Sequence, residues 1–345
     1  MKKINRPILL LFVLGALLAG CSSPAARPAT QPSNATPTLA LAAPTATPAA
    51  SPTPQATKVL LVAPGETGLQ SVATELAGKS GLTVVSQPAL QKTNLTPDVK
   101  MVLLAAPSTD LSDLLASAPQ VQFVVVSGVD LPAANNLTII RARPEHQAFV
   151  AGFISVLLST DFRAAGLLPS DGSLGAGLKE AFENGGHYFC GVCAPGWPLK
   201  VYYPVVGEQP TAADGPTWQA SAASLFDNQK VEVYYMDPAA ARPEVIAYLQ
   251  GRAQGDKTLA VLGATPPPGE LKPQWAGSVH FDLAEALGQV WPDVAAGKGG
   301  AVRDAPLVVD NINPDLLSPG KMRLVNNLIE QLKAGQVLTN SIPAQ

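Results

Sequence analysis

The sequence predicts an α/β fold built from two parallel β-sheets. From Lys58 onward, short runs of aliphatic and β-branched residues alternate with segments of helical periodicity. The runs are almost continuously hydrophobic, which is typical of parallel strands that are buried on both faces. About eleven such runs occur, and two sheets accommodate this number better than a single open sheet.

The first series of elements ends near residue 160. A long helix is expected over 144–159, because Pro144 suits a first helical turn and Phe149 and Phe153 begin an apolar face. Shorter helices are expected at 70–79 and 108–117. Strands are expected at 58–63, 82–85, 101–106, 123–128 and 137–142.

A second series of alternating elements follows. Strands are expected at 164–169, 200–206, 231–236, 258–263 and 277–281, with helices at 174–184, 216–227 and 241–251. Asp282 and Glu285 form a capping-box pattern that predicts the start of another helix. The last helix is expected to begin after Ser318 and to end at Gly335.

The N-terminus has the pattern of an exported lipoprotein. Lys2, Lys3 and Arg6 precede an apolar run of 13 residues, and the small residues Ala19 and Gly20 stand directly before Cys21. A membrane-spanning helix needs about 20 apolar residues, so the run is too short for one. We therefore expect residues 1–20 to be a signal peptide and Cys21 to carry a lipid anchor. The protein would lie on the extracytoplasmic face of the cell membrane, held to the lipid bilayer by its acyl chains.

Residues 21–57 are expected to be the lipidated Cys21 followed by a spacer of 36 residues. It holds eight prolines among Thr, Ala and Ser, with Arg27 as its one charged residue. Such a composition cannot bury a core, and 36 extended residues would reach roughly 110 Å. Without the three cations of the signal peptide, 20 Lys and Arg face 26 Asp and Glu, and no basic stretch indicates nucleic-acid binding.

Cys190 and Cys193 are the other two cysteines. Outside the cytoplasm we expect them to form a structural disulfide. A redox role is an alternative, although a reactive cysteine usually lies at a helix start, whereas here Ala-Pro-Gly-Trp-Pro follows. A zinc site with His187 is a further alternative, but a closed structural site needs four ligands.

No enzyme active site is evident. The glycines in DGSLGAG at 171–177 have the wrong order for a dinucleotide-binding turn, and no G-x-S-x-G motif accompanies the three histidines. We expect no catalytic residues, no metal site and no cofactor.

Segments from about residue 119 to residue 337 share their order and roughly their spacing with one known family. APQVQFVVVSG is similar to "PDVKFAIIDG", RPEHQAFVAGFISVLLS to "EEGSFLAGVAAAL", and LKEAFENGGHYF to "FEAGFEAGVKAV". GPTWQASAASLFDNQKVEVYY, WPDVAAGKGG and LKAGQV resemble further motifs of that family. The chain thus resembles the basic membrane protein family, the lipoproteins that serve as substrate-binding components of nucleoside-type ABC importers.

This resemblance implies a type I periplasmic-binding fold, in which hinge strands join two Rossmann-like lobes. Residues 58–163 plus 278–345 would form lobe 1, and residues 164–277 would form lobe 2. The protein would be a monomer that binds a small polar, nucleoside-like solute between the lobes and presents it to an ABC permease in the membrane.

In such folds the ligand lies beyond the carboxyl ends of the strands. There we expect a site formed by Glu66, Ser127, Asp130, Ser170, Asp171, Asp237 and Thr265. Glu145 joins this set through the family resemblance. The same residue types are also common as helix caps and in turns.

The chain departs from the family at the ligand loops, where PGETGLQSV and GATPPPGEL replace its motifs. This favours, as an alternative function, a sensor or interaction lipoprotein that keeps the fold without transport. A thiol-disulfide protein that uses Cys190 and Cys193 is a weaker alternative.

Overall fold

A computed structural model describes residues 57–63, 67–172, 177–194, 201–255 and 258–340. The predicted signal peptide, Cys21, most of the spacer and Glu66 lie outside these residues. Among the helices in the described ranges, none has the length and apolar character needed to cross a membrane.

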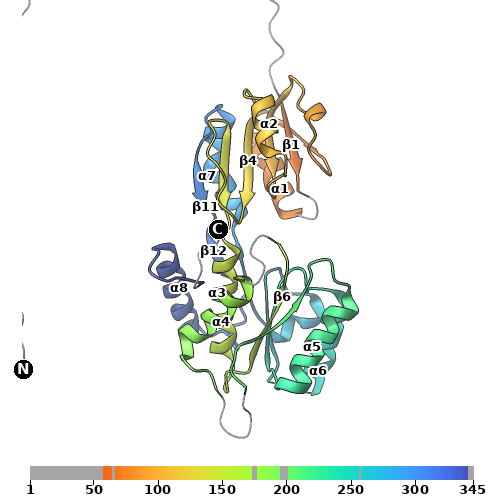
Figure 1. Ribbon diagram of the computed structural model, residues 1–345, viewed down its shortest axis with the longest axis vertical. Coiled ribbons are helices and arrows are strands. Elements are labelled where there is room, and N and C mark those ends of the chain that lie inside the picture. The colour runs from red at the N-terminus through yellow and green to blue at the C-terminus, as the bar shows by residue number, and fades with distance from the viewer. Residues whose placement is uncertain (1–56, 64–66, 173–176, 195–200, 256–257, 341–345) are drawn as a thin grey trace, which may run out of the picture. The chain divides into compact units, whose positions relative to one another are not determined.

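The first sheet has six parallel strands in the order β11-β5-β4-β3-β1-β2 (Figure 1). Its two faces form separate cores because alternate residues of each strand point to opposite sides. The strands are β1 (Lys58–Val62), β2 (Thr83–Ser86), β3 (Val99–Leu104), β4 (Gln122–Ser127), β5 (Leu137–Arg141) and β11 (Val302–Asp304).

Helices cover both faces of this sheet. α1 (Thr67–Lys79) and α7 (Leu283–Ala295) pack together on one face, and α2 (Leu111–Ser117) packs on the other. A short 3₁₀ turn, η1 (Lys92–Asn94), precedes β3. We refer to this sheet and its three helices as the first lobe.

The second sheet also has six strands, in the order β12-β10-β9-β8-β6-β7. All neighbours are parallel except β12, which runs antiparallel to β10. The expectation of two largely parallel sheets is therefore confirmed. The strands are β6 (Ala164–Pro169), β7 (Val205–Gln209), β8 (Val233–Met236), β9 (Ala260–Gly263), β10 (Trp275–Phe281) and β12 (Leu307–Asp310).

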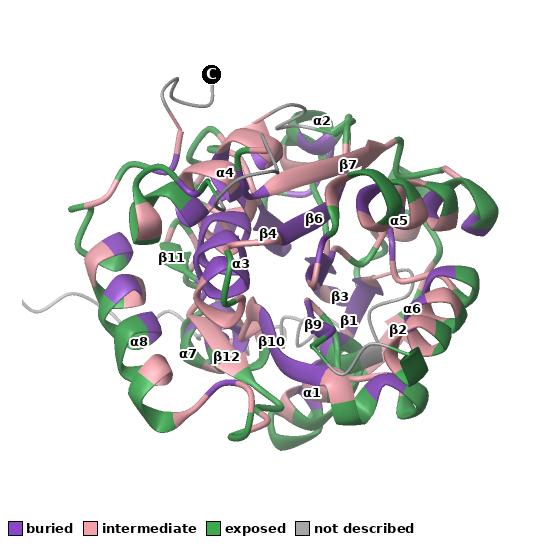
Figure 2. Ribbon diagram, turned by 90° about the horizontal axis from the view of Figure 1, so that it is seen from below, coloured by how far each residue is buried: buried purple, intermediate pink, exposed green. Residues whose placement is uncertain are grey.

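Five helices cover the second sheet and complete the second lobe. One core contains α3 (Pro144–Leu158), α4 (Gly177–Cys190) and α8 (Pro319–Lys333), and another contains α5 (Gly215–Gln229) and α6 (Pro243–Gly255). A 3₁₀ helix, η2 (Gly269–Gln274), leads into β10. Figure 2 shows α3 as buried along most of its length beside α4, whereas α8 has an exposed outer face.

Two glycines allow α3 and α4 to pack backbone against backbone. A Cβ atom on Gly152 would lie 1.9 Å from the carbonyl oxygen of Phe182, and one on Gly185 would lie 1.9 Å from that of Phe149. Both distances are far below van der Waals contact, so the crossing requires glycine at each position.

Within the described residues, the chain passes between the lobes three times, and each crossing segment is short. Residues 142–143 join β5 to α3, Asp282 joins β10 to α7, and residues 305–306 join β11 to β12. Every crossing starts at the carboxyl end of a strand in its own sheet. The carboxyl edges of the two sheets must therefore face each other across the crossings.

Three expectations about the elements were wrong in detail. α3 packs on the second sheet rather than in lobe 1, because its apolar residues extend around most of the helix and α4 and α8 bury them. Residues 307–333 also belong to the second lobe, where β12 pairs with β10 and α8 joins the α3 core. Of the strand expected over 200–206, residue 200 lies outside the described residues, and β7 begins only at Val205, since Tyr203 pairs instead with Cys193 and Pro204 has no N–H to donate.

The helix ends predicted at Asp282, Ser318 and Gly335 agree closely with the structure, whereas α4 and α6 continue to Cys190 and Gly255, beyond their expected ends. Asp282 caps α7 by accepting a hydrogen bond from the Glu285 N–H at 2.8 Å, and Ser318 caps α8. Gly335 has a φ of 67°, a left-handed conformation that glycine adopts without strain, just after α8 ends.

Candidate functional site

Four of the expected site residues follow neighbouring strands of the second sheet. Ser170 and Asp171 follow β6, Asp237 follows β8, and Thr265 lies two residues after β9. Because β9, β8 and β6 are adjacent and parallel, these residues lie along one carboxyl edge. This edge is one wall of the candidate site.

Asp171 ties two loops of this edge together. Its carboxylate accepts hydrogen bonds from the N–H of Thr211 at 2.8 Å and from its hydroxyl at 2.6 Å. The hydroxyl bond lowers the pKa of Asp171, which therefore stays ionised. Arg242 donates to the Thr211 carbonyl at 3.3 Å, so the loops after β6, β7 and β8 are linked.

Asp237 lies deeper and has fewer partners. Its carboxylate accepts a hydrogen bond from the N–H of Ala239 at 2.9 Å. Burial raises the pKa of Asp237 to about 6, since desolvation outweighs this one bond. A ligand that donates hydrogen bonds to the Asp237 carboxylate would stabilise its ionised form.

A buried polar contact joins α3 to the floor of the site. The Nε2 of Gln147 donates to the hydroxyl of Tyr235 at 3.2 Å and to the carbonyl of Val279 at 2.9 Å. Tyr235 is buried just before Asp237, and burial raises the pKa of its hydroxyl, which stays protonated. The contact therefore holds the start of α3 against β8 and β10.

Thr265 contributes its backbone to a second buried group. The hydroxyl of Ser278 donates to the Thr265 carbonyl at 2.8 Å and accepts hydrogen bonds from Trp275 Nε1 and Asn311 Nδ2. The Thr265 side chain is exposed. The loop after β9 is thus held to β10, with the Thr265 side chain left accessible.

The first sheet contributes Ser127, the last residue of β4, and Asp130, which follows this strand. Ser127 is buried, and its hydroxyl donates to the Val129 carbonyl at 2.6 Å, so it holds the turn together. The Asp130 side chain is exposed and pairs with Arg141 at 3.4 Å. Of these two residues, Asp130 is therefore the one accessible to a ligand.

Glu145 lies in the first turn of α3, directly after a crossing. Its side chain is 9% exposed and pairs with Arg143 at 3.5 Å through Oε1. Its Oε2 is buried without a hydrogen-bond partner among the described residues. The start of the helix favours a negative charge at this position.

Comparisons with known proteins bear on the fold. No family model matches the chain, and no curated protein does. An ABC transporter solute-binding protein from Conexibacter woesei has a similar structure, with a TM-score of 0.58 at 17% identity over 82% of this chain and 98% of that one. One from Aeropyrum pernix has a TM-score of 0.58 at 14% identity over 84% and 95%. A LacI family transcriptional regulator from Enterococcus faecium with bound ribose has a TM-score of 0.53 at 14% identity over 74% and 96%.

The chain has the type I periplasmic-binding-protein fold. At these identities the similarity establishes the fold alone. Within this fold, the three crossings are the hinge segments, and the facing carboxyl edges are the walls of the candidate site.

Sequence reasoning missed the residues of the hinge. Arg141, Arg143 and Gln147 flank the first crossing and pair with acids or with Tyr235. The short motif Arg-Ala-Arg-Pro, between a strand and a helix, was the available signal. Local periodicity does not show where a chain crosses between lobes, so this motif alone did not identify the hinge.

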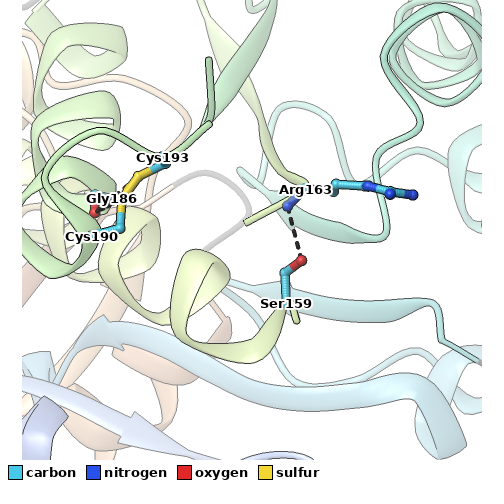
Figure 3. Close-up of a disulfide and its surroundings, with 5 residues drawn as sticks. All are labelled: Ser159, Arg163, Gly186, Cys190 and Cys193. Atoms are coloured by element: carbon cyan, nitrogen blue, oxygen red, sulfur yellow. Dashed lines mark hydrogen bonds between the residues drawn. A yellow bond between two sulfur atoms is a disulfide. The ribbon is translucent and has the colours of Figure 1, made fainter. Parts of the chain in front are cut away.

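Cys190 and Cys193 form a disulfide at the end of α4 (Figure 3), with their Cα atoms 5.4 Å apart. Cys193 is fully buried in the core of the second sheet, which is typical of a structural bond rather than a reactive one. Figure 3 also shows the Ser159 hydroxyl accepting a hydrogen bond from the Arg163 N–H at 2.9 Å. In the part of the chain that the structure describes, no cluster of three metal-binding side chains occurs.

Proposed function

We propose that the protein is a lipid-anchored solute-binding component of an ABC import system. It would bind a small polar solute between the facing carboxyl edges of its two sheets and present it to a membrane permease. The observation that carries the proposal is the solute-binding fold with Asp237 at the facing edge, a half-buried acid whose carboxylate has one hydrogen bond among the described residues.

The residues at the edges suggest which solutes to test. Asp130, Asp171 and Asp237 supply acceptors, while the Arg242 guanidinium and the exposed Thr265 hydroxyl supply donors. Hydroxyl-bearing solutes such as sugars and nucleosides match this mixture. The family resemblance favours the nucleosides.

A thermal-shift screen of the purified full-length chain tests solute binding. Nucleosides, sugars and amino acids are added singly, and a bound solute raises the melting temperature with the logarithm of its concentration once that exceeds the Kd. We expect a hit among the hydroxyl-bearing compounds. The absence of a concentration-dependent shift from any of the three classes would argue against the proposal.

Anchoring at Cys21 is the second part of the proposal. It rests on the charged start, the apolar run and the small residues before Cys21. In a bacterial host fed labelled palmitate, the chain should incorporate label, and Cys21→Ser should abolish it. Incorporation that survives this substitution would contradict the assignment.

A regulatory function is the alternative candidate. The structural relatives include a transcriptional activator of the comK gene from Bacillus halodurans, with a TM-score of 0.56 at 12% identity. The N-terminal 57 residues hold four basic residues in two separate places, which does not suit DNA binding. The regulatory function that the sequence permits is therefore that of a sensor that contacts a membrane protein. Co-purification with a receptor rather than a permease would favour this function.

A further inference from the structure

A pocket of about 590 Å³ lies at the crossings, between the two lobes. α7 of the first lobe lines one side through Glu285 and Gln289. α8 of the second lobe and the residues after it line the other, among them Ile329 and Val337. The floor is formed by the crossings themselves and by the first turn of α3.

This pocket is distinct from the candidate solute site. None of Ser127, Asp130, Ser170, Asp171, Asp237 and Thr265 lines it. Its lining comes from α7, α8, the first turn of α3, the strand ends at the hinge segments, and three residues after α8, none of which is a loop after β4, β6, β8 or β9. A ligand here would therefore not compete directly for the solute-binding edge.

The charged residues of the pocket differ in how fully they are paired. Arg141 is matched by Asp304 and Asp130. Arg143, by contrast, has one ion pair at 3.5 Å, and its side chain is 34% exposed. On the helical walls, Glu285 accepts a hydrogen bond from Gln289, and Glu330 lies 3.9 Å from Lys333. Among the lining cations, Arg141 already has two carboxylate partners and Lys333 is 76% exposed to solvent, so Arg143 is the partly enclosed cation with capacity for an added anion.

His146 stands beside Arg143 in the pocket wall. Burial and the nearby Arg143 charge lower the pKa of His146 to about 4, so the imidazole is neutral at physiological pH. A neutral imidazole can donate a hydrogen bond without adding a charge. Arg143 and His146 together therefore offer a carboxylate a charged partner and a neutral one.

The rest of the lining is apolar. Phe281, Leu307, Leu332 and Leu338 line the pocket together with Ile329 and Val337. A ligand with a short hydrocarbon body would remove this surface from water. Arg143 and these side chains together favour a molecule with one anionic end and one apolar end.

We propose that this hinge pocket binds a small carboxylate with a short apolar body, its carboxylate against Arg143 and His146. Because the walls belong to different lobes, the shape of the pocket depends on the angle between them. An occupant would stabilise the angle that fits it, so its binding and solute binding would be energetically coupled. The binding itself does not depend on the proposed transport function.

Nuclear magnetic resonance of the histidine side chains provides the test, because the chain has three histidines and one lines the pocket. The full-length protein is titrated with isovalerate and, separately, with the neutral isovaleramide. We expect isovalerate to shift the His146 signals saturably, with a Kd on the order of 1 mM, and isovaleramide to shift them at least tenfold less. Equal shifts from both compounds, or none from isovalerate, would overturn the proposal.

A pair of variants locates the carboxylate. Arg143→Gln should weaken isovalerate binding at least tenfold. Arg303→Gln is the matched control, because Arg303 is an exposed arginine of β11 that does not line the pocket, and its Kd should equal that of the wild type. Unchanged affinity in Arg143→Gln, with a folded spectrum, would show that the carboxylate does not lie there. The isovaleramide comparison needs no substitution and decides the question if that variant does not fold.

Discussion

Arg141 donates two hydrogen bonds to the carboxylate of Asp304, from Nε to Oδ1 at 2.5 Å and from Nη2 to Oδ2 at 3.0 Å. These residues end β5 and β11, and the chain leaves the first sheet within two residues of each. The pair therefore joins two of the three hinge segments at their starting points. Paired geometry of this kind is more specific than a single ion pair.

Replacing Asp304 with Asn should cost stability through this pair. We expect a loss of about 0.5 kcal/mol, since Asp304 is 63% exposed and solvent screens the interaction. Urea denaturation measures it, with Asp315→Asn as a control at an exposed carboxylate in the loop after β12. Arg141 lowers the pKa of Asp304, so the contribution is present above the unfolded pKa and disappears as the pH falls below it. A loss that is equally large at pH 2 and pH 7 would contradict this origin.

Gly185→Ala should be one of the most destabilising small substitutions in the chain. The new methyl group would overlap the Phe149 carbonyl, and separating α3 from α4 should cost about 3 kcal/mol. Gly251→Ala is the matched control, because it lies in α6 with no atom within 4 Å of the added Cβ. This control should gain about 0.5–1 kcal/mol through helix propensity. Similar effects of both substitutions in thermal unfolding would refute the close helix packing.

Asp237→Asn should stabilise the protein without solute at neutral pH. The folded pKa of about 6 lies above the ordinary value, so the folded state holds the proton more tightly and stability falls as the pH rises from about 4 to 6. Asn removes the cost of this ionisation, which we place at about 1–2 kcal/mol at pH 7 after allowing for partial exposure. The gain should vanish near pH 4 in urea denaturation.

Asp171→Asn, on the same edge, should have the opposite effect on stability to Asp237→Asn. The Thr211 hydroxyl bond lowers the pKa of Asp171, so its ionised form stabilises the fold above the unfolded pKa. This variant should lose stability at pH 7 and match the wild type at low pH. If both variants changed stability in the same direction at pH 7, the contrast between the two acids would be wrong.

His146→Gln should reduce the dependence of the free energy of unfolding on pH between pH 6.5 and pH 4. The folded pKa of about 4 lies below the ordinary 6.5, so the unfolded state binds the proton first and stability is lost as the pH falls from 6.5 to 4. We expect the wild type to lose about 1–2 kcal/mol in this window from His146, after allowance for screening. Asp237 acts with the opposite sign between pH 4 and 6, so the effect is read from the difference between His146→Gln and the wild type. A His146 resonance that titrates near 6.5 would contradict the expected burial.

Reduction of the disulfide should lower the stability of the second lobe without changing the affinity for solute. The bond closes a four-residue loop at the end of α4, for which chain entropy gives about 2 kcal/mol. The double variant Cys190→Ser/Cys193→Ser should show this loss and should keep any solute affinity. A loss of affinity with an unchanged melting temperature would instead favour a redox role.

Local sequence patterns were sufficient for most strands and for several helix ends, but not for β11 and β12 or for the lobe boundaries. Continuous apolar runs marked the buried strands, and side-chain caps such as Asp282 and Ser318 marked the helix starts. The lobe of α3 was misassigned because periodicity shows that a face is buried without showing which sheet buries it. Contacts between distant segments make that assignment, namely the close crossing of α3 with α4 and the hydrogen bonds from Gln147 to β8 and β10.

The candidate site was predicted in part for a similar reason. The rule about carboxyl ends placed Asp171, Asp237 and Thr265 on one edge, as the sheet order requires. This rule could not show that the Ser127 hydroxyl is hydrogen-bonded within a turn. Nor could it show that the Asp237 carboxylate accepts a single hydrogen bond among the described residues. Both features depend on burial and on partners, which arise from tertiary packing.

Calorimetric titration of the full-length chain, with the solute found by thermal shift, tests the account most directly. We predict one solute per chain, and a Kd that rises at least tenfold in Asp237→Asn but stays unchanged in Asp315→Asn. Binding that is indifferent to Asp237, or no binding heat from any solute, would contradict solute capture between the facing edges of the two sheets.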